Sequence, residues 1–597
     1  MIERKKQIGR DKVSRLVNWG HWFAFFNGIL AMVIGNRYIE AIGYPDTIIG
    51  WLYLSLSTIG QFSFLAFIIY LVFIFPISTI FPYSKILRGF SALIATFSLC
   101  ILLYDTIVYN DYGMHLSPFA FDLAWSDLNT LLHGTSYIVT PIAILLLELV
   151  VANFIWKRIE NIQKRNWGPN VVIFVCICFI SSHLIHIWAD ARDIRAVTRF
   201  DDSYPLSYPA TAKTFMETHG LKGLEKHNTS EVNTQEITNL HYPKNPLTCH
   251  KEKHANVLLI TIESLRANMV TNKTMPFLSH YISQNQYFSD HYSGGNQFNS
   301  SMFSLLYGLQ GSYIKAKDFN FTPPVLTQIL KKEGYQLGLF IHGDQNKTVQ
   351  PSAMFKDFKV HTVNGHNNAS SADQKLTIEF NDWSKALSSP WFALLDLRSP
   401  ETYDTPVGFL GIKTIKAPND FEPAQRVLFN QYRQSLYFID QLLRKTIDGI
   451  SKDTLVIITG LDGKVFTSNE NESLTNLSPD NVKVPMVIHW PNGNASSINY
   501  PTSHYGLIPT LMTHVLGCTN PSTDYSAGRH LLEPDQQNWN YIGDDRVFAI
   551  YQPNEITVIN RHGQYYIYDI NYKHQLHKKM SAPELIQVMR ESRRFYK

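Results

Sequence analysis

Five long apolar runs in the first third of the chain constrain its fold more than any other feature. They lie at about 19–42, 52–80, 89–109, 135–156 and 170–189. Each is long enough to cross a hydrocarbon core roughly 30 Å thick as an α-helix. No small-residue cleavage site follows the first run, so we expect it to remain as a transmembrane helix rather than to be removed as a signal peptide. The sequence therefore predicts a five-helix integral membrane protein.

The charged residues between these runs predict which side of the membrane each connection faces. Lys and Arg cluster before the first run, after the second and after the fourth, whereas the connections 43–50 and 110–134 contain neither residue. Connections rich in Lys and Arg stay in the cytoplasm. We therefore place the amino terminus in the cytoplasm. Because five spans follow it, everything from about residue 191 lies on the opposite side.

The composition of the chain changes after the last apolar run. From about residue 200 the sequence has the mixed polarity of a globular domain, and the remaining length is enough to bury a core of its own. We divide the chain into a five-helix transmembrane domain at 1–190, an interfacial linker at 191–250 and an extracytoplasmic domain at 251–597. The formal net charge is only +4, which argues against a nucleic-acid-binding protein.

The linker contains one segment with the signals of a short helix. Ser207 suits the N-cap, Pro209 suits the first turn and Gly220 suits the end of such a helix. Unpaired backbone N–H groups at its amino end, with Lys213 one turn along, would form a phosphate-binding site at the outer face of the membrane. The alternative is a connector at the membrane surface whose lysine faces solvent.

Two of the five cysteines, Cys249 and Cys518, fall outside the apolar runs. If their part of the chain faces an oxidising compartment, they can form a disulfide. Two free thiols are the alternative. The other three, Cys100, Cys176 and Cys178, lie within apolar runs, where a cysteine packs as a small hydrophobic residue.

The extracytoplasmic domain begins with strands that alternate with helices. Each strand is a continuous apolar run, which is typical of a sheet covered by helices on both faces. The expected strands lie at 256–263, 335–340, 391–396, 454–459 and 484–489. This pattern predicts an α/β domain.

Four segments, in this order, resemble sulfatases and the lipoteichoic-acid and phosphoethanolamine transferases of the alkaline phosphatase superfamily. They are Asn256–Leu265, Met275–Leu278, Val484–Pro491 and Thr502–Leu511. The resemblance implies the α/β fold of that superfamily, in which Asp, Glu and His side chains hold metal ions around a Thr, Ser or modified Cys nucleophile. The metals lower the pKa of the nucleophile and neutralise phosphate or sulfate oxygens.

The register of this resemblance implies that the nucleophile is missing. Glu263 stands at the acid position after the first strand, but Phe298 takes the place of the transferase threonine. A phenyl ring cannot attack phosphorus. Ser300 or Ser301 is the alternative nucleophile if the register shifts, although serines in such a turn are more often helix caps.

Most of the metal ligands are missing as well. Leu461 and Asp462 stand where the active enzymes carry an Asp-His pair, and the segment 476–483, which should bring a histidine, has none. Glu263 and Asp462 are too few for a catalytic metal site, which needs several converging oxygen and nitrogen atoms. We therefore expect a pseudoenzyme without a required cofactor. A residual divalent cation such as Mg or Mn is the alternative.

Almost the whole chain resembles the YejM family of bacterial inner-membrane proteins, whose members are also called PbgA or LapC. The similarity includes Val17–Ala24, Ile187–Asp190 and Leu206–Pro209 and continues to the end of the chain. It implies a multi-pass inner-membrane protein whose sulfatase-like carboxy-terminal domain lies in the periplasm. It also implies a non-catalytic sensor of lipopolysaccharide that serves outer-membrane homeostasis by regulating proteolysis.

The resemblance also implies a partner and a lipid-binding segment. In that family the transmembrane helices restrain a LapB-type adaptor, which promotes degradation of the lipid A enzyme LpxC by the protease FtsH. Lipid A is held by the residues that correspond to Leu206, Ser207, Tyr208, Pro209, Ala210, Thr211, Ala212, Lys213, Thr214 and Phe215. The match departs at a paired arginine, which is Lys213-Thr214 in this chain. One positive charge and bidentate phosphate recognition are lost, which affects the expected strength of lipid binding but not its place.

Two other functions are compatible with the sequence. One is a metal-dependent phosphatase or phosphoethanolamine-type transferase that acts on lipid head groups and uses a nucleophile such as Ser300. The other is the binding or transport of cardiolipin, which needs the same membrane anchor.

Overall fold

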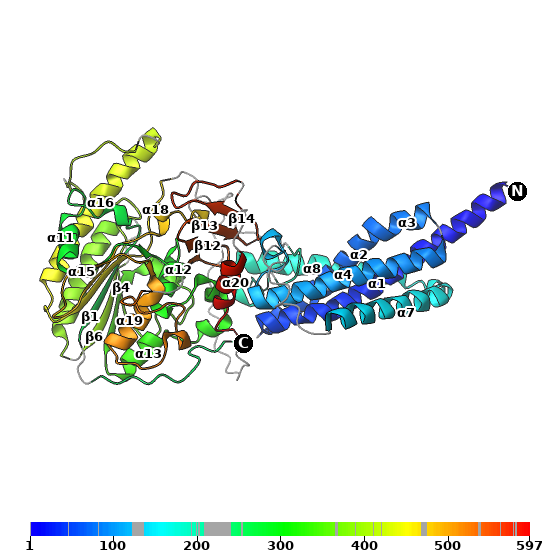
Figure 1. Ribbon diagram of the computed structural model, residues 1–597, viewed down its shortest axis with the longest axis horizontal. Helices are drawn as coiled ribbons and strands as arrows, with labels where there is room; N and C mark the ends of the chain where they lie inside the picture. The colour runs from blue at the N-terminus through cyan, green and yellow to red at the C-terminus, as the bar shows by residue number, and fades with distance from the viewer. Residues whose placement is uncertain are drawn as a thin grey trace. The chain divides into compact units, whose positions relative to one another are not determined.

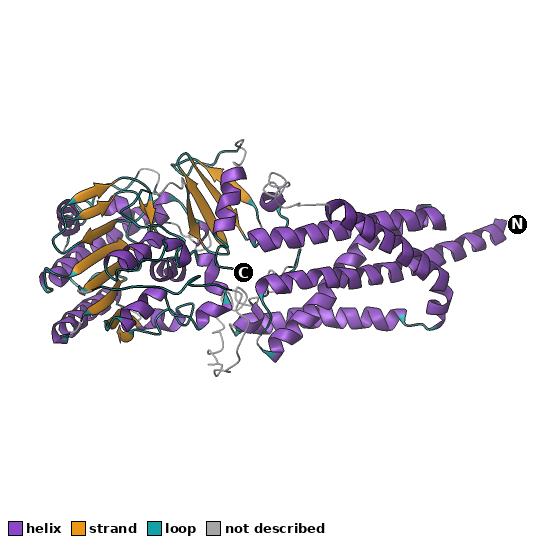
Figure 2. Ribbon diagram, turned by 60° about the horizontal axis from the view of Figure 1, so that its bottom comes forward, coloured by secondary structure: helices purple, strands orange, loops and turns teal. Residues whose placement is uncertain are grey.

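The structure is a computed structural model with two compact units, Met1–Asn239 and Leu240–Lys597. The first unit is helical, and the second combines helices with strands (Figure 2). The structure describes residues 2–596. The residues left out within this range are 46, 82, 122–135, 193, 199, 201–202, 208–239, 252–254, 364–367, 389, 410, 419–420, 467–473, 535–538, 562, 577 and 579–581.

Five helical spans of the first unit are long and apolar enough to cross a membrane, counted over the described residues. This confirms the five spans predicted from the sequence. The long helices are α1 (Ile2–Ile42), α2 (Ile48–Ile69), α4 (Ser84–Tyr112), α7 (Ser136–Lys164) and α8 (Gly168–Ala191) (Figure 1). The second span is not one regular helix, because α2 continues through a π-helical turn, η1 (Tyr70–Ile74), into α3 (Phe75–Ile80).

Glycines allow the helices of the first unit to pack closely. A side chain at Gly35 of α1 would lie 2.2 Å from the ring of Phe62 in α2. A side chain at Gly60 of α2 would lie 2.8 Å from the backbone of Phe179 in α8. A side chain at Gly60 would clash with backbone, so that contact requires glycine, whereas one at Gly35 would force the ring of Phe62 to move. Small residues at such contacts are what allows helix backbones to approach each other in a membrane.

Two acidic side chains inside the first unit are held by polar neighbours. Glu148 of α7 is fully buried and accepts a hydrogen bond from Nδ2 of Asn27 in α1 over 3.1 Å. Asp105 of α4 accepts from the hydroxyl of Tyr38 over 2.5 Å, and Nδ1 of His115 lies 2.7 Å from the same carboxyl oxygen. These contacts connect α1 to α7 and α4 and satisfy groups that would be costly to bury alone in a membrane.

An eight-stranded sheet forms the centre of the second unit. Its order is β5-β4-β6-β1-β7-β8-β2-β9, and only β8 runs antiparallel to its neighbours. The strands are β1 (Val257–Ile262), β2 (Gln286–Phe288), β4 (Gln336–His342), β5 (Lys359–Val363), β6 (Trp391–Leu397), β7 (Leu455–Gly460), β8 (Met486–His489) and β9 (Ser496–Ile498).

Helices cover both faces of this sheet, as the continuous apolar strands predict (Figure 1). Val257 and Leu259 of β1 belong to one hydrophobic core, and Leu258 and Ile260 belong to the other. The first core is shared with α12 (Phe298–Tyr307), α13 (Val325–Lys332) and α19 (Leu507–His514), and the second with α11 (Pro276–Gln284), α15 (Ala369–Ala386) and α16 (Pro423–Asp448).

All five strands expected from the sequence are present, as β1, β4, β6, β7 and β8. Three further strands of the sheet lack the continuous apolar pattern that identifies those five. β2 and β9 are only three residues long, and β5 leaves most of its side chains exposed or half-buried at the edge of the sheet. Sequence reasoning therefore finds the centre of the sheet better than its edges.

The carboxy-terminal part adds a second, antiparallel sheet that the sequence analysis does not predict. Its order is β11-β12-β13-β14. The strands are β11 (Asn540–Gly543), β12 (Val547–Gln552), β13 (Glu555–Asn560) and β14 (Tyr565–Tyr568), and α20 (Ala582–Glu591) follows them. A parallel pair of short strands, β3 (His291–Tyr292) and β10 (Thr502–Ser503), joins two loops of the unit.

Cys249 and Cys518 form a disulfide, with their sulfur atoms 2.01 Å apart. Beside it, the N–H of Thr519 donates to the carbonyl of Thr248 over 3.1 Å. The disulfide and this hydrogen bond attach the first described residues of the second unit to the segment that follows α19.

Candidate functional site

Charged and polar side chains gather at the carboxyl edge of the central sheet, directly after β1, β4, β6 and β7. In open α/β sheets this edge is where ligands bind. It is also where the resemblance to the alkaline phosphatase superfamily places the catalytic centre. We call the following residues the edge cluster: Glu263, Ser264, Asp344, Gln345, Arg398, Glu401, Asp462 and Lys464.

Glu263 is only 6% exposed, and its carboxyl oxygens face other side chains. Its Oε1 atom accepts a hydrogen bond from the amide of Gln345, and Oε2 lies 3.9 Å from Nε of Arg398. Burial, with the nearby Asp396, raises the pKa of Glu263 well above its ordinary value, although Arg398 acts in the opposite direction. The carboxyl group of Glu263 thus interacts with protein groups of the edge cluster.

Ser264 has a left-handed backbone conformation, with φ at 60°. For a residue other than glycine this conformation costs about 1–2 kcal/mol. Three hydrogen bonds hold it in place. The N–H donates to Oδ1 of Asp462 over 2.7 Å, the hydroxyl donates to Glu401, and the carbonyl accepts from the hydroxyl of Tyr432 over 2.5 Å. Ser264 thereby ties the end of β1 to the end of β7 and to α16.

Asp462 and Lys464 both interact with Glu401. Burial raises the pKa of Asp462 to about 7, and the negative charge of Glu401 acts in the same direction. Nζ of Lys464 lies 2.5 Å from Oε2 of Glu401. Burial by itself lowers the pKa of Lys464, but Glu401 and Tyr403 outweigh it, so the pKa is raised and the lysine keeps its charge.

Arg398 supplies the second cation of the edge cluster. Its Nη1 atom donates to Oδ2 of Asp344 over 2.6 Å. Burial alone would raise the pKa of Asp344, but Arg398 lowers it below its ordinary value. Two fixed positive charges, those of Arg398 and Lys464, thus lie among the carboxylates where the resemblance implies metal ions.

A buried carboxylate positions Arg398. Asp373 of α15 is fully buried and accepts hydrogen bonds from the backbone N–H groups of Arg398, over 3.1 Å, and of Ser399, over 2.9 Å. Nε2 of His342, the last residue of β4, lies 2.8 Å from the same carboxylate. The loop that carries Arg398 is therefore fixed to α15 and β4.

The segment expected to carry the nucleophile holds no exposed hydroxyl. Phe298 begins α12 and packs against the hydrophobic core. Ser300 is 2% exposed, and its hydroxyl donates to the carbonyl of Gln297 over 3.2 Å; the hydroxyl of Ser301 donates to the carbonyl of Gly295 over 3.0 Å. The expectation that these serines cap the helix is wrong, because the N-cap is Gln297, whose side chain makes no capping bond.

The two segments that would bring an Asp-His pair and a histidine serve packing instead. Leu461 is fully buried in the hydrophobic core, and its N–H donates to the carbonyl of Ile262 over 2.8 Å. The segment 476–483 contains a short helix, α18 (Pro479–Val482). Leu477 is buried there, and its carbonyl accepts a hydrogen bond from the hydroxyl of Tyr551 over 2.5 Å.

The structure brings Glu263 and Asp462 into one cluster, where both oxygens of Glu263 and Oδ1 of Asp462 face protein groups. They face an amide, a backbone N–H and a guanidinium group. Among the residues that the structure describes, no three His, Cys, Asp or Glu side chains are arranged to hold a metal ion. This donor set does not fit a catalytic metal site, which needs several converging free ligands.

The second predicted site, the lipid A segment at 206–215, lies mostly outside the described residues. The same holds for Lys213 and for the predicted helix that ends at Gly220. Leu206 and Ser207 are described. Leu206 is 70% exposed with φ at 55°, and the N–H of Ser207 donates to the carbonyl of Tyr204 over 3.2 Å.

The residues just before this segment are attached to α2. Tyr204 is buried, and its hydroxyl lies 2.5 Å from Oγ1 of Thr58. The carbonyl of Pro205 accepts a hydrogen bond from Nε2 of Gln61 over 3.0 Å. The ring of Tyr204 also packs edge-on against Phe62. The start of the predicted lipid segment is thereby fixed to a membrane-spanning helix of the same unit.

Both halves of the chain match known families. Residues 6–249 match a family described as a domain of unknown function, DUF3413, and residues 255–518 match the sulfatase family. The inner membrane protein YejM of Salmonella typhimurium is 32% identical over 607 residues, which cover 99% of this chain and 99% of that protein. The chain belongs to the YejM family. The five apolar helices agree with the membrane location in that family's name, and the sulfatase match confirms the predicted fold of the second unit.

Other relatives of this YejM-family chain extend the comparison. An uncharacterized protein of Haemophilus influenzae is 33% identical over 578 residues, which cover 95% of this chain and 94% of that protein. A protein of the alkaline phosphatase superfamily from Vibrio parahaemolyticus, of known structure, aligns with 16% identity and a TM-score of 0.44 over 58% of this chain and 88% of its own.

Sequence reasoning found Glu263 and Asp462 but missed the cations that neutralise the edge cluster. A usable signal was present, because Arg398 directly follows β6 and Lys464 lies four residues after β7. Charged residues at the ends of parallel apolar strands meet at one edge of the sheet. The left-handed conformation of Ser264 leaves no such signal, since serine rarely adopts it.

Proposed function

We propose that this protein is a non-catalytic inner-membrane sensor of lipopolysaccharide that regulates lipopolysaccharide synthesis. The interfacial segment 206–215 holds lipid A. While lipid A is scarce, the transmembrane helices restrain a LapB-type adaptor, and FtsH spares LpxC. When lipid A accumulates, the adaptor is released and synthesis slows. The observation that carries the proposal is the 32% identity to YejM over 99% of both chains.

The edge cluster supports the absence of catalysis. A metal-dependent hydrolase of this superfamily needs an activated nucleophile and free metal ligands. Phe298 stands at the nucleophile position, and the hydroxyl of Ser300 is buried against a backbone carbonyl. Glu263 and Asp462 are bonded to Gln345 and Ser264. These residues serve to stabilise the domain.

The contacts just before the lipid segment support the idea that lipid binding there is coupled to the membrane helix α2. Tyr204 and Pro205 are bonded to Thr58 and Gln61 of α2. A lipid that binds the segment after Ser207 would change the force on these two bonds. Coupling between sites travels through such contiguous contacts when they have two arrangements.

We place the second unit in the periplasm. The Lys and Arg distribution puts the amino terminus in the cytoplasm and, after five spans, the rest of the chain outside it. The disulfide between Cys249 and Cys518 supports this side, because structural disulfides form in oxidising compartments such as the periplasm.

Mass spectrometry of bound lipids tests the binding step. We expect the protein purified from cells to carry lipid A, and Lys213→Ala to lower its occupancy by about threefold or more, because a cation that pairs with phosphate is removed. Lys222→Ala, in the same linker, is the matched control and should keep wild-type occupancy. Unchanged occupancy in Lys213→Ala would remove this segment from the proposal. Cardiolipin as the only bound lipid would favour a cardiolipin-binding protein instead.

The retained acids favour one second candidate, a metal-dependent phosphatase or phosphoethanolamine-type transferase acting on lipid head groups. It requires a divalent cation beside Glu263 and a nucleophile such as Ser300. Anomalous scattering from Mn²⁺ at Glu263, together with turnover that Ser300→Ala abolishes, would establish it. We expect neither, because the oxygens of Glu263 face Gln345 and Arg398 and Ser300 is buried.

A further inference from the structure

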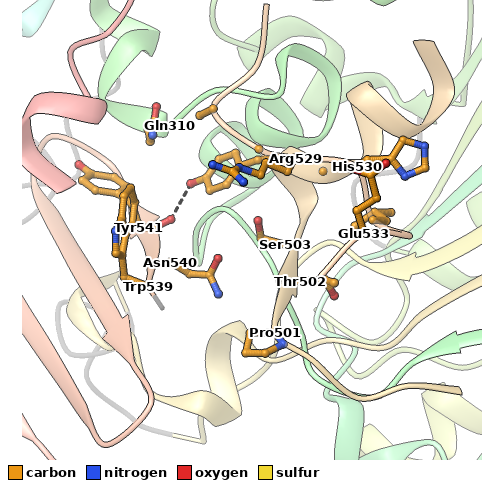
Figure 3. Close-up of a pocket in the computed structure, with 15 residues that line it drawn as sticks. Gln310, Pro501, Thr502, Ser503, Arg529, His530, Glu533, Trp539, Asn540 and Tyr541 are labelled. Atoms are coloured by element: carbon orange, nitrogen blue, oxygen red, sulfur yellow. Dashed lines mark hydrogen bonds between the residues drawn. The ribbon is translucent and has the colours of Figure 1, made fainter. Parts of the chain in front are cut away.

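A groove of about 450 Å³ lies between α1, α2 and α8 of the first unit. Phe25 and Ile29 of α1 line it together with Phe174 of α8, and α2, which packs against both of these helices, contributes Ile59 and Ser63. Most of the lining is apolar. Figure 3 shows a second cavity, in the second unit, but its volume is about 40 Å³, which has room for about three water molecules only.

The groove occupies one half of the membrane thickness. Along α8 it runs from Trp167 to Val175, which is about 12 Å at the rise of an α-helix. A hydrocarbon core is about 30 Å thick, so this length matches one leaflet. Trp167 directly precedes α8 and is exposed, as is usual for a tryptophan at a membrane surface. The groove therefore begins at one surface of the membrane and ends near its middle.

In the other half of the membrane, side chains of this chain fill the space between the same three helices. Tyr38 of α1, Leu54 of α2 and Ala189 of α8 share one hydrophobic core with Phe200 and Tyr204, which follow α8. A transmembrane helix of a partner crosses the whole core of about 30 Å, whereas this groove is open over less than half of that length. An occupant that spans a single leaflet fits it better.

A lipid acyl chain has the size and the chemistry of such an occupant. A methylene group takes up about as much room as a water molecule in the liquid, which is about 30 Å³, so the groove holds about 15 of these groups. This is the content of one fatty-acyl chain. A chain of the surrounding leaflet also reaches from the membrane surface to the middle, as the groove does.

Polar and basic side chains stand where the groove meets the membrane surface. The guanidinium group of Arg165 lies over the ring of Trp167, 5.4 Å from its centroid, and Lys164 precedes it in the chain. Asn170 is exposed, and it lines the groove about one turn along α8 from Trp167. Cations at this depth attract lipid phosphates, and an amide can donate to an ester carbonyl.

We propose that this groove holds an acyl chain of one phospholipid from the leaflet on the side of Arg165, with the lipid phosphate beside that arginine. The bound chain completes the contact between α1 and α8 where the groove separates them. Only the name of the leaflet, which is cytoplasmic in the orientation proposed above, rests on the proposed function. The groove lies at the opposite end of α8 from the lipid A segment, so the two sites are distinct.

Native mass spectrometry of the full chain, purified from membranes in detergent, tests the site. We expect a phospholipid to remain bound, and Val171→Trp to lower the fraction of chains that retain it by about threefold or more, because the indole ring fills part of the groove. Ile29→Trp fills the groove from α1 and should have the same effect. Val172→Trp is the matched control, because Val172 is 62% exposed on the same helix and is not among the residues that line the groove.

Two further variants test the head group and separate this site from the lipid A segment. Arg165→Ala should lower retention by about twofold or more, because a charged hydrogen bond to phosphate is lost, whereas Lys157→Ala, at an exposed position on the same side, should not. Lys213→Ala should leave this phospholipid in place even if lipid A is lost. Absence of a retained phospholipid, or equal retention in both groove-filling variants, would overturn the site. Unchanged retention in Arg165→Ala would overturn the placement of the phosphate.

Photo-crosslinking in native membranes tests whether a partner helix occupies the groove instead. Phe174 is replaced by p-benzoylphenylalanine, which keeps an aromatic ring at a position that lines the groove. We expect adducts with lipid and none with another protein. A protein adduct at Phe174 that is absent when the crosslinker replaces Ile173, an exposed residue outside the lining, would overturn the assignment to a lipid chain.

Discussion

The backbone N–H of Ser264 donates a hydrogen bond to Oδ1 of Asp462 over 2.7 Å, although the two residues are 198 positions apart in the chain. This bond joins the ends of β1 and β7 at the edge where a superfamily enzyme would hold its metals. It uses an oxygen of Asp462 that a metal ion would need. The same residues thus stabilise the carboxyl edge of the central sheet.

Asp462 makes stability depend on pH in a direction opposite to that of most acids. Its pKa is about 7 in the folded protein and 3.8 in the reference state. The folded state therefore holds this proton more tightly, and the stability it contributes is lost as pH rises from about 4 to 7. We expect Asp462→Asn, whose amide oxygen still accepts from Ser264, to raise stability at pH 8 by roughly 4 kcal/mol at most.

Thermal unfolding of the full chain in detergent at pH 4 to 8 measures this effect. The gain from Asp462→Asn should shrink toward zero at the acidic end. Asp453→Asn, in the exposed turn before β7, is the matched control and should show no such trend. An Asp462→Asn variant that is less stable than the wild type at pH 8 would show that the ionised carboxylate is needed.

The left-handed conformation of Ser264 predicts a second mutational effect. Ser264→Val should destabilise the second unit by about 2–3 kcal/mol, because a β-branched residue is strained at positive φ and the hydroxyl bond to Glu401 is lost. Ser264→Gly loses the same hydroxyl but relieves the backbone strain, so its cost should be smaller. The denaturant midpoints of the two variants measure these two losses of stability. Equal losses would mean that the backbone strain contributes nothing.

The disulfide should contribute substantially to the stability of the second unit. Cys249 and Cys518 are separated by 269 residues in sequence, and closing so long a loop restricts the unfolded chain strongly. We expect Cys249→Ser, or reduction of the wild type, to lower stability by about 2–5 kcal/mol. Cys176→Ser, at an exposed position on α8, should leave it unchanged. Reductant that has no effect on the melting temperature would contradict this expectation.

The attachment of the lipid segment to α2 predicts a variant that binds lipid without signalling. Tyr204→Phe with Gln61→Leu removes the bonds to Thr58 and Pro205 while leaving 206–215 intact. On the proposed function, lipid A occupancy should stay near the wild-type value while LpxC no longer responds to lipid A. Thr79→Val, which alters a hydroxyl in α3, is the control. A normal LpxC response in the double variant would exclude this route.

The parts of this chain that its sequence predicts depend on local composition. The parts that it does not predict depend on contacts between residues far apart in the chain. Apolar length alone predicts the five spans, and continuous apolar runs predict β1, β4, β6, β7 and β8. Glu263 and Asp462 could be found because each follows such a strand. The pairing of Arg398 with Asp344 depends on two strand ends meeting in space, which local sequence does not encode.

The second sheet illustrates the same limit. β11 to β14 are short and lie next to one another in sequence, but their burial depends on packing against segments far away, such as Leu477 against Tyr551.

The level of LpxC tests the central claim most directly. Cells whose only copy of this protein is under repressible control are depleted of it, and LpxC is followed by immunoblot. A non-catalytic restraint on the adaptor predicts that LpxC falls on depletion, and that a variant carrying both Ser300→Ala and Asp462→Asn restores it as fully as the wild type. An LpxC level that stays constant on depletion, or a correctly expressed double variant that fails to restore it, would contradict the claim.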